Sequence, residues 1–221
     1  MNKAEKVTAI LPIRSRSQRI KNKNTRLISD RPLYSYIINT LKQVKAIDQI
    51  VISTDYEELH DVFLDDSRIK VLQRAPHLTG NCDVNLVIGD VLDSVEGERF
   101  LQTHVTNPLL TAGSIKQALS AFFGGAPIYD SVFSATKVQK RFWDGSGRRL
   151  NHGLGDEPTT QTLEPWFEEN SCIYVFSRTS FFRHHHRIGL NPLVFPIPKI
   201  ESVDIDDEED FEIARRLIES Q

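Results

Sequence analysis

The sequence predicts an α/β protein built on a doubly wound, mostly parallel β-sheet. Continuous apolar runs of strand length, such as residues 7–13, are typical of strands that are buried on both faces of a sheet. These runs alternate with stretches of helical periodicity, and such an alternation forms right-handed βαβ units. The 221 residues, of which 39% are hydrophobic and 26% charged, suffice for a single domain over residues 1–221.

Each element up to residue 138 follows from its local pattern. Strands are expected at residues 7–13, 49–53, 69–72, 99–105 and 131–138. Pro32 opens the first helix because its φ angle is preset for a helical first turn, and the helix buries an apolar face that ends near Val44. Further helices are expected from about residue 56 and at residues 83–95 and 114–123.

The regular alternation stops after residue 138. Residues 139–170 are polar and rich in Gly and Pro, and the stretch is too long for an ordinary loop. We expect it to be a lid, a partner-binding arm or a disordered segment. Residues of about 178–200 form a second segment that is expected to be irregular. Strands at 172–176, 193–197 and 202–205 and a helix at 208–219 complete the expected fold.

Composition and charge exclude several classes of protein. A net charge of -3 argues against a generally basic nucleic-acid binder. Cys82 and Cys172 form neither a zinc motif nor a disulfide framework, as in proteins of a reducing compartment. No apolar run reaches the roughly 20 residues that span a bilayer, and the first residues lack the pattern of a signal peptide. We therefore expect a cytoplasmic protein without membrane or nucleic-acid partners.

A basic loop follows the first expected strand. From Lys6 through Ser29 the sequence holds seven cations and no acid. Doubly wound sheets bind their ligands beyond the carboxyl ends of the strands, where guanidinium and ammonium groups can hold a triphosphate. Neither GxGxxG nor GxxxxGKS is present, so this is not a known glycine-rich phosphate loop. A solvated basic loop or an RNA-contacting patch remains the alternative.

An acidic segment lies near residue 205. In a strand over residues 202–205, Asp204 and Asp206 would point to the same face, and two carboxylates with open positions suit Mg²⁺ that is shared with substrate phosphates. The alternative assigns these acids to the start of the following helix, where negative charge is favourable. Asp207 to Asp210 fit that second role.

Five segments in register resemble the acylneuraminate cytidylyltransferases, also called CMP-sialic acid synthetases, and are similar to the related CMP-KDO synthetases. They are Arg14-x-x-Ser17-x-Arg19-Ile20-x-x-Lys23-Asn24, Val51–Asp55, Asn107–Thr111, Asn170–Tyr174 and Ser202–Asp206. The resemblance implies a Rossmann-like nucleotidyltransferase fold with a dimerisation excursion. It also implies transfer of CMP from CTP to the anomeric hydroxyl of a sialic-acid-like α-keto sugar acid, with release of pyrophosphate. CMP-KDO synthesis and a catalytically silent sugar-nucleotide binding module are the alternatives.

The resemblance implies roles for individual residues and makes the chain an expected homodimer. The implied catalytic residues are Arg14, Lys23 and Asp204, and the implied Mg²⁺ ligands are Asp204 and Asp206. The implied nucleotide-binding residues are Arg14, Ser17, Arg19, Lys23, Asn24, Arg74 and Asn85, of which the last two would contact cytosine. The implied sugar-binding residues are His104, Thr106, Gln161 and Tyr174.

The sequence departs from the family pattern mainly on the sugar side. Gln18 stands where many relatives have Lys, and His104 where Gln is common; Leu110 and Thr160 replace Arg, and Ser171 replaces Gly. We expect His104 to hydrogen-bond the acceptor sugar. Because an unperturbed imidazole titrates near ~6.5, the KM for the sugar is expected to rise between about pH 6 and 8. In the alternative, His104 only packs at the end of its strand and the segment 184–187 carries specificity.

Overall fold

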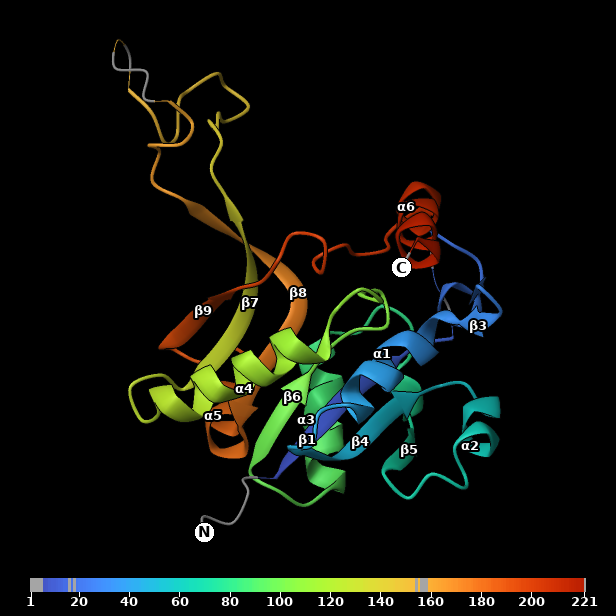
Figure 1. The fold of residues 1–221 in the computed structure, drawn as a ribbon. Coiled ribbons are helices and arrows are strands. Elements are labelled where there is room, and N and C mark those ends of the chain that lie inside the picture. The colour runs from blue at the N-terminus through green and yellow to red at the C-terminus, as the bar shows by residue number, and fades with distance from the viewer. Residues whose placement is uncertain (1–5, 16, 18, 154, 156–158, 221) are drawn as a thin grey trace.

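The computed structural model describes residues 6–15, 17, 19–153, 155 and 159–220, and Figure 1 shows its fold. In this part of the chain one seven-stranded sheet has the order β5-β4-β1-β6-β8-β7-β9. Its strands are β1 (Val7–Ile13), β4 (Ile47–Thr54), β5 (Ile69–Gln73), β6 (Arg99–Gln102), β7 (Ser131–Val138), β8 (Trp166–Ser177) and β9 (Pro192–Pro196). A second, two-stranded sheet pairs β2 (Leu27–Ile28) with β3 (Arg31–Pro32).

The predicted mostly parallel sheet is confirmed. Strands β5, β4, β1 and β6 pair in parallel, and β9 is parallel to β7. Strand β8 is the exception, because it lies between β6 and β7 and runs antiparallel to both. The carboxyl ends of β1, β4 and β6 therefore meet at one edge of the sheet, which is where an α/β sheet of this kind binds ligands.

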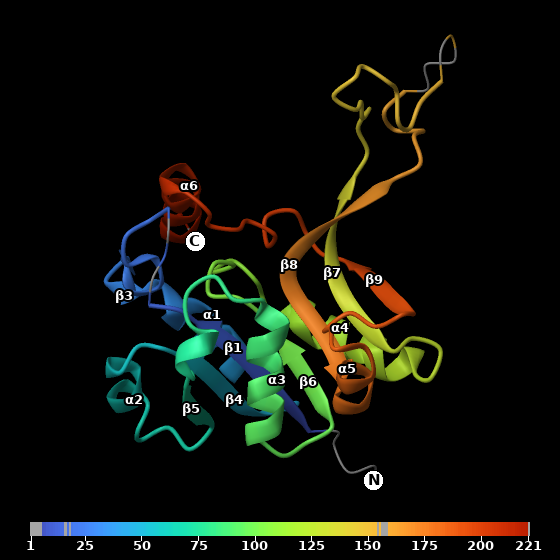
Figure 2. The ribbon, with the colours of Figure 1, turned by 180° about the vertical axis from the view of Figure 1, so that it is seen from behind.

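Helices cover both faces of the sheet, as Figures 1 and 2 show. The helical elements are α1 (Leu33–Lys42), α2 (Glu58–Val62), α3 (Val84–Ser94), α4 (Ala112–Gly125), α5 (Arg178–His184) and α6 (Glu208–Glu219), with short 3-10 turns η1 (Lys23–Thr25) and η2 (Pro76–Leu78). None of the described helices is long and apolar enough to cross a membrane.

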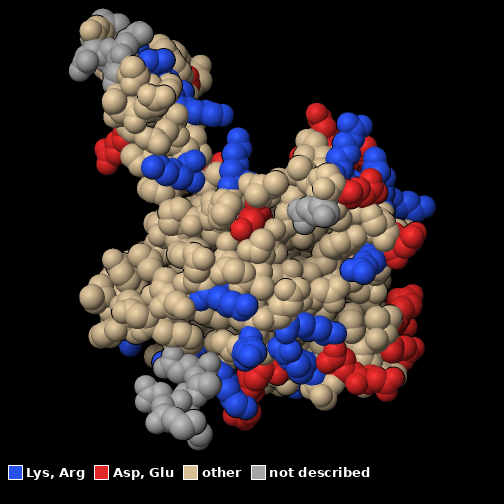
Figure 3. Space-filling model, in the orientation of Figure 1, with Lys and Arg blue, Asp and Glu red and all other residues tan. Residues whose placement is uncertain are grey.

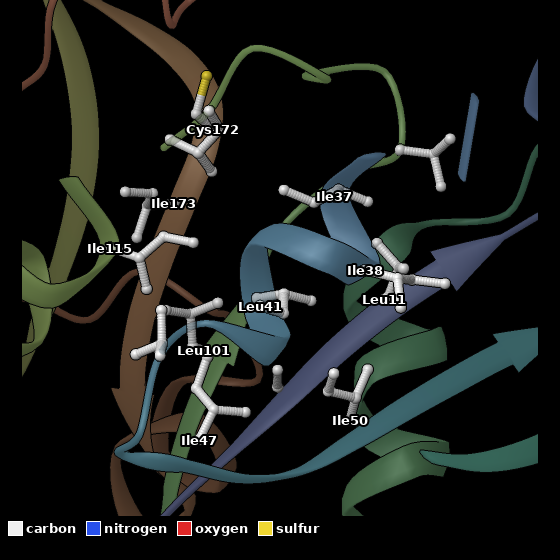
Figure 4. Close-up of a cluster of buried hydrophobic side chains, with 14 of the residues drawn as sticks. Leu11, Ile37, Ile38, Leu41, Ile47, Ile50, Leu101, Ile115, Cys172 and Ile173 are labelled. Atoms are coloured by element: carbon white, nitrogen blue, oxygen red, sulfur yellow. The ribbon is translucent and has the colours of Figure 1, made fainter. Parts of the chain in front are cut away.

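Two apolar clusters hold these layers together. In the larger one, Leu11, Ile50 and Leu101 from the strands meet Ile37 and Leu41 of α1 (Figure 4). In the smaller one, α3 and α5 pack on the opposite face of the sheet through a set of buried apolar residues: Ile88, Val91, Leu92, Phe100, Phe176 and Phe181. The continuous apolar pattern of β1 follows from this arrangement, since successive side chains of a strand enter opposite layers.

Three sequence expectations about strand positions need correction. The strand expected at residues 202–205 is wrong: this segment is irregular and has no sheet partner, although the amide of Ile205 donates to the carbonyl of Thr106 at 3.0 Å. The strand expected at 99–105 ends at Gln102, and the one expected at 172–176 begins earlier, at Trp166. The segment 178–200, which was otherwise expected to be irregular, contains the helix α5, and β9 confirms the strand expected at 193–197.

The stretch between β7 and β8 projects from the sheet as an arm (Figures 1 and 2). We use this name for residues 139–165. Trp143 and Arg149 form an isolated β-bridge within it, and the rings of Phe142 and Trp166 stack at its base with centroids 4.9 Å apart. The described part of the stretch therefore protrudes from the sheet, and its role as a lid or a partner-binding arm stays a prediction.

Candidate active site

Hydrogen bonds to neighbouring elements hold the basic loop after β1. The amide and Oγ of Ser15 both donate to the carboxylate of Asp55, which follows β4. Asn24 Nδ2 donates to the carbonyl of Arg14 at 2.9 Å, and Arg14 Nη1 donates to Asn81 Oδ1 at 3.0 Å. These contacts fix Arg14 at the carboxyl edge of the sheet. The sequence alone assigned no role to Asp55, although Asp55 lies within one of the five family segments.

A cavity of about 270 Å³ opens beside this loop. It brings together seven residues that the sequence predicts as site residues: Arg14, Lys23, Asn24, Arg74, His104, Thr106 and Asp206. Pro12, Gly80, Cys82, Val84, Val87 and Val105 complete its lining. The cavity thus combines several cations with an apolar wall, which is the combination that a nucleotide requires. We call it the basic cavity.

Lys23 is buried between the loop and the segment before α6. Its Nζ donates to the carbonyl of Ile205 at 2.5 Å. Burial lowers the pKa of Lys23, while the charges of Asp204 and Asp206 act in the opposite direction. Two further ion pairs join the same two parts of the chain: Arg19 with Asp206 at 2.6 Å, and Arg26 with Glu208 at 2.5 Å. Residues 205–208 therefore close one side of the basic cavity, and we call them the clasp.

A second cavity, of about 450 Å³, adjoins the first at Asp206, which lines both. Its other lining residues come from β7, β8 and the segment before and within α6: Thr136, Glu168, Glu169, Asn170, Ser171, Lys199, Ser202, Val203, Asp204, Asp210 and Ile213. We call it the acidic cavity. Figure 3 shows Lys and Arg side chains on the arm and beside α6, on either side of a hollow in the surface.

Asp204 has the features of an incomplete cation ligand. Its Oδ1 is buried and has no hydrogen-bond partner among the described residues. Burial raises the pKa of Asp204, and a hydrogen bond from Thr106 partly offsets this effect. Asp204 and Asp206 line one cavity, so two hard oxygen donors are available to a divalent cation. No cluster of three or more His, Cys, Asp or Glu residues in the described chain could hold a metal by itself.

Four predicted site residues lie apart from the basic cavity. Ser17 is half-buried and outside the cavity lining, and Gln161 is exposed on the arm. The side-chain amide of Asn85 bonds instead to Asp83 and to the backbone of Arg187. Tyr174 is fully buried, and its hydroxyl donates to Glu169. Arg19 borders the site through Asp206. The departure noted at Gln18 lies outside the described residues.

His104 lines the basic cavity, but it does not behave as an ordinary histidine. Burial, together with the nearby charge of Arg187, lowers its pKa to about 3. The imidazole is therefore neutral throughout the range from about pH 6 to 8. The expectation that titration of His104 makes the KM for the sugar rise across this range assumed a solvated ring, and the burial of this imidazole does not support it.

Arg187 is a residue of the site that the sequence alone did not single out. It lies in the segment 184–187, which was named only as an alternative carrier of specificity, and its side chain is largely buried. Its Nη1 donates to Gln102 Oε1 at 2.6 Å, and its guanidinium lies 3.6 Å from the ring centroid of Tyr174. Arg187 lies 85 residues from Gln102 in sequence, so no local pattern could have paired them.

The fold and the two cavities define the class of protein: a doubly wound α/β protein with a basic cavity at the carboxyl edge of its sheet, where such folds bind their ligands. Comparison with known proteins then identifies the family. The sequence profile of the cytidylyltransferases matches residues 8–144, which is more than half of the chain. The chain belongs to the cytidylyltransferase family.

Curated relatives are similar along almost the whole chain. It is 26% identical over 220 residues to post-translational flagellin modification protein B of Campylobacter coli, covering 94% of this chain and 93% of that protein. It is 24% identical to a pseudaminic acid cytidylyltransferase of Campylobacter jejuni, covering 94% of each chain. It is also 24% identical to an N-acylneuraminate cytidylyltransferase of Escherichia coli, covering 95% of this chain but 51% of that protein. The chain thus spans about half of the length of this last relative.

Solved structures agree on the fold. A CMP:2-keto-3-deoxy-manno-octonic acid synthetase complexed with CTP superposes with a TM-score of 0.72 at 14% identity, covering 98% of this chain and 99% of that one. A 4-diphosphocytidyl-2C-methyl-D-erythritol synthase from Anaerococcus prevotii superposes with a TM-score of 0.71 at 13% identity, covering 98% of this chain and 100% of that one. These likenesses confirm the Rossmann-like nucleotidyltransferase fold.

Proposed function

We propose that this protein transfers CMP from CTP to the anomeric hydroxyl of a sialic-acid-like α-keto sugar acid and releases pyrophosphate. The observation that carries the proposal is the pair of adjoining cavities. One is lined by Arg14, Lys23 and Arg74 and the other by Asp204, and Asp206 borders both. Relatives named for sialic, pseudaminic and legionaminic acid substrates support the same class of acceptor.

In this proposal the basic cavity holds the nucleotide. Arg14 and Lys23 face the phosphates and stabilise the negative charge that develops on the leaving pyrophosphate, since preorganised cations act most strongly in a site shielded from water. Arg74 bonds Ser53 through Nε and Nη2, so its guanidinium is held rigidly in the wall of the cavity. The remaining N–H groups of this guanidinium can then donate to the cytosine base of CTP.

We further propose that Asp204 and Asp206 hold Mg²⁺. The unpartnered buried oxygen of Asp204 and the second carboxylate in the same cavity fit such an ion, whose remaining ligands would be phosphate oxygens and water. When bound, Mg²⁺ would neutralise charge on the triphosphate.

The acceptor would bind where the two cavities adjoin, between His104 in the lining of the basic cavity and the acidic cavity. Its anomeric oxygen attacks the α-phosphorus as the bond from that phosphorus to the bridging oxygen of pyrophosphate breaks, and the hydroxyl proton passes to solvent. Much of the acceleration would come from holding the two substrates in line, because the reaction needs no covalent enzyme intermediate.

Incubation with CTP, Mg²⁺ and a panel of keto sugar acids tests the function. Pyrophosphate release with a nine-carbon acid, and none with UTP in place of CTP, is the expected result. Release with KDO alone would move the protein to the CMP-KDO alternative. CTP binding without release for any acid would make it a silent binding module.

We also propose that the active form is a homodimer in which the arm of one copy covers the acidic cavity of the other. Support comes from the aromatic side chains on and beside the arm: Trp143 is 51% exposed, Trp166 40% and Phe167 45%. Gln161, which is exposed on the arm, would then reach a sugar in the partner subunit. The dimer thereby explains why Gln161, whose implied role is to bind the sugar, does not line either cavity of its own chain.

A further inference from the structure

Arg187 is a largely buried cation without a close counter-ion. Its side chain is 12% exposed, and the carboxylate nearest to it, that of Glu169, is 4.0 Å away. Its short contacts are with neutral groups, namely Gln102 and the ring of Tyr174. Burying a guanidinium among neutral partners is costly, so this position calls for an explanation other than stability.

The contacts of Arg187 determine the protonation of His104. Arg187 Nη1 lies 3.3 Å from His104 Nε2, and Gln102 Nε2 lies 3.0 Å from the same atom. The guanidinium can only donate. The orientation of the Gln102 amide is fixed as well, because its Oε1 accepts from Arg187 and its Nε2 also donates to the carbonyl of Thr103 at 2.8 Å. His104 Nε2 is therefore an acceptor, and the ring carries its proton on Nδ1.

The charges around His104 point to an anionic ligand. Arg187 faces the ring from the segment after α5, and Lys23 and Arg14 face it from the loop after β1. Burial and these three cations together make a protonated imidazole unfavourable there, whereas a neutral ring can donate one N–H beside them. A neutral donor surrounded by cations is suited to an anionic oxygen.

We propose that Arg187 is a positioning residue which, together with Gln102, holds His104 as the neutral Nδ1–H tautomer, so that His104 donates to the carboxylate of the acceptor sugar acid. This inference rests on the proposed function and names the group that recognises its acceptor. It also explains how the site recognises an acid although Leu110 and Thr160 stand where relatives have arginines.

Histidine side-chain NMR tests the tautomer without any turnover. In ¹⁵N-labelled protein, with His104→Gln to assign the signal, the ring should show Nδ1–H and should not titrate between about pH 5.5 and 8. In Arg187→Met, which keeps much of the side-chain length but removes the charge, the ring should mix its tautomers, because Nε2 loses one donor and the Gln102 amide loses the contact that fixes its orientation. An Nε2–H tautomer in the wild type, or a ring that titrates near neutrality, overturns the proposal.

Kinetics test the ligand. Arg187→Met should raise the KM for the sugar acid about fivefold, the cost of roughly one hydrogen bond, and leave the KM for CTP within about twofold. Arg187→Lys, which keeps the charge, should recover most of this loss. The matched control is Arg183→Met, which removes an exposed arginine from α5 and should change neither constant.

A raised KM for CTP instead would assign the Nδ1–H to the triphosphate and overturn the acceptor assignment. If Arg187→Met does not fold, the wild-type tautomer and the Arg187→Lys kinetics still decide the proposal. A wild type without pyrophosphate release would refute the proposed function alone, because the NMR result does not depend on turnover.

Discussion

At the scale of single residues, the site contains groups whose burial is unfavourable in the free protein. Lys23 is buried with a lowered pKa, and Asp204 is half-buried with a raised pKa and a buried, unpartnered Oδ1. Strongly perturbed groups of this kind cluster where a ligand later supplies the missing partner. The sequence could predict both residues from their motifs, but not their burial, which depends on contacts across 182 residues.

The cations of the basic cavity should be needed for turnover. Arg14→Ala and Lys23→Ala should each lower kcat by about 10²-fold, because each variant removes a charge that faces developing anionic oxygen. Lys21→Ala is the control, since Lys21 belongs to the same loop but is exposed. Steady-state pyrophosphate release measures the effect, and near wild-type kcat for both cavity variants would exclude the assignment.

The acids near residue 205 should divide into two groups. Asp204→Asn and Asp206→Asn should lower activity and raise the Mg²⁺ concentration required for half-maximal rate. Asp207 caps α6 by accepting from the amides of Glu209 and Asp210, so Asp207→Ala should cost about 1 kcal/mol of stability and leave the Mg²⁺ requirement unchanged. Equal Mg²⁺ curves for Asp206→Asn and Asp207→Ala would contradict a metal site.

Asp204 should also affect stability in a pH-dependent way. Burial raises the pKa of Asp204 in the folded protein, so between the unfolded and folded pKa values the native state binds more protons than the unfolded state. The contribution of this group to stability therefore falls as the pH rises through that window. Asp204→Asn should remove this loss and show a higher Tm than the wild type at pH 7 without Mg²⁺. A lower Tm at that pH would contradict the unpartnered, buried carboxylate.

At the scale of elements, periodicity predicted those strands that lie between two layers. It failed at residues 202–205, where Val203 and Ile205 alternate with acids as in a half-buried strand. Both side chains pack on the larger apolar cluster, yet the backbone has no strand beside it. The alternation of apolar and polar residues predicts which side chains are buried. It does not predict whether a neighbouring strand is available for pairing.

Strand β8 contains a strained residue at the acidic cavity. Ser171 has φ 58°, in the left-handed region that favours glycine, next to an irregularity in the register of β7 and β8. The family pattern has Gly at this position. Ser171→Gly should therefore stabilise the protein by about 0.5–1 kcal/mol, the relief of strain less the entropic cost of glycine. Urea unfolding measures it, with Ser202→Gly as a control in the same cavity; an equal or lower stability for Ser171→Gly would show that no strain is stored.

At the scale of the whole molecule, the arm could be predicted as an excursion because it is richer in Gly and Pro than the rest of the chain. Its direction could not, since the direction is set by the long antiparallel pairing of β7 and β8. The Arg187–Gln102–His104 contacts were equally unpredictable, because α5 and β6 come together only through the order of strands in the sheet.

The arm should determine the oligomeric state. We expect the wild type to sediment as a dimer and Phe167→Ser, which removes an exposed ring at the base of the arm, to shift it toward the monomer. Leu190→Ser is the matched control, because Leu190 is 83% exposed and lies after α5, outside the arm. Analytical ultracentrifugation over a range of concentrations measures the shift. A monomeric wild type would refute the proposed dimer.

The clasp has a consequence for the synthesis of the protein. Lys23 contacts Ile205 across 182 residues of sequence, and Arg19 and Arg26 depend on partners equally far away. During translation Arg19, Lys23 and Arg26 therefore lack these partners until residues 205–208 have been made. A nascent chain can begin to pair the first strands of its sheet during this time, but its basic cavity is open on the side that the clasp later closes. The proposed CTP site is thus complete only after the clasp has been translated.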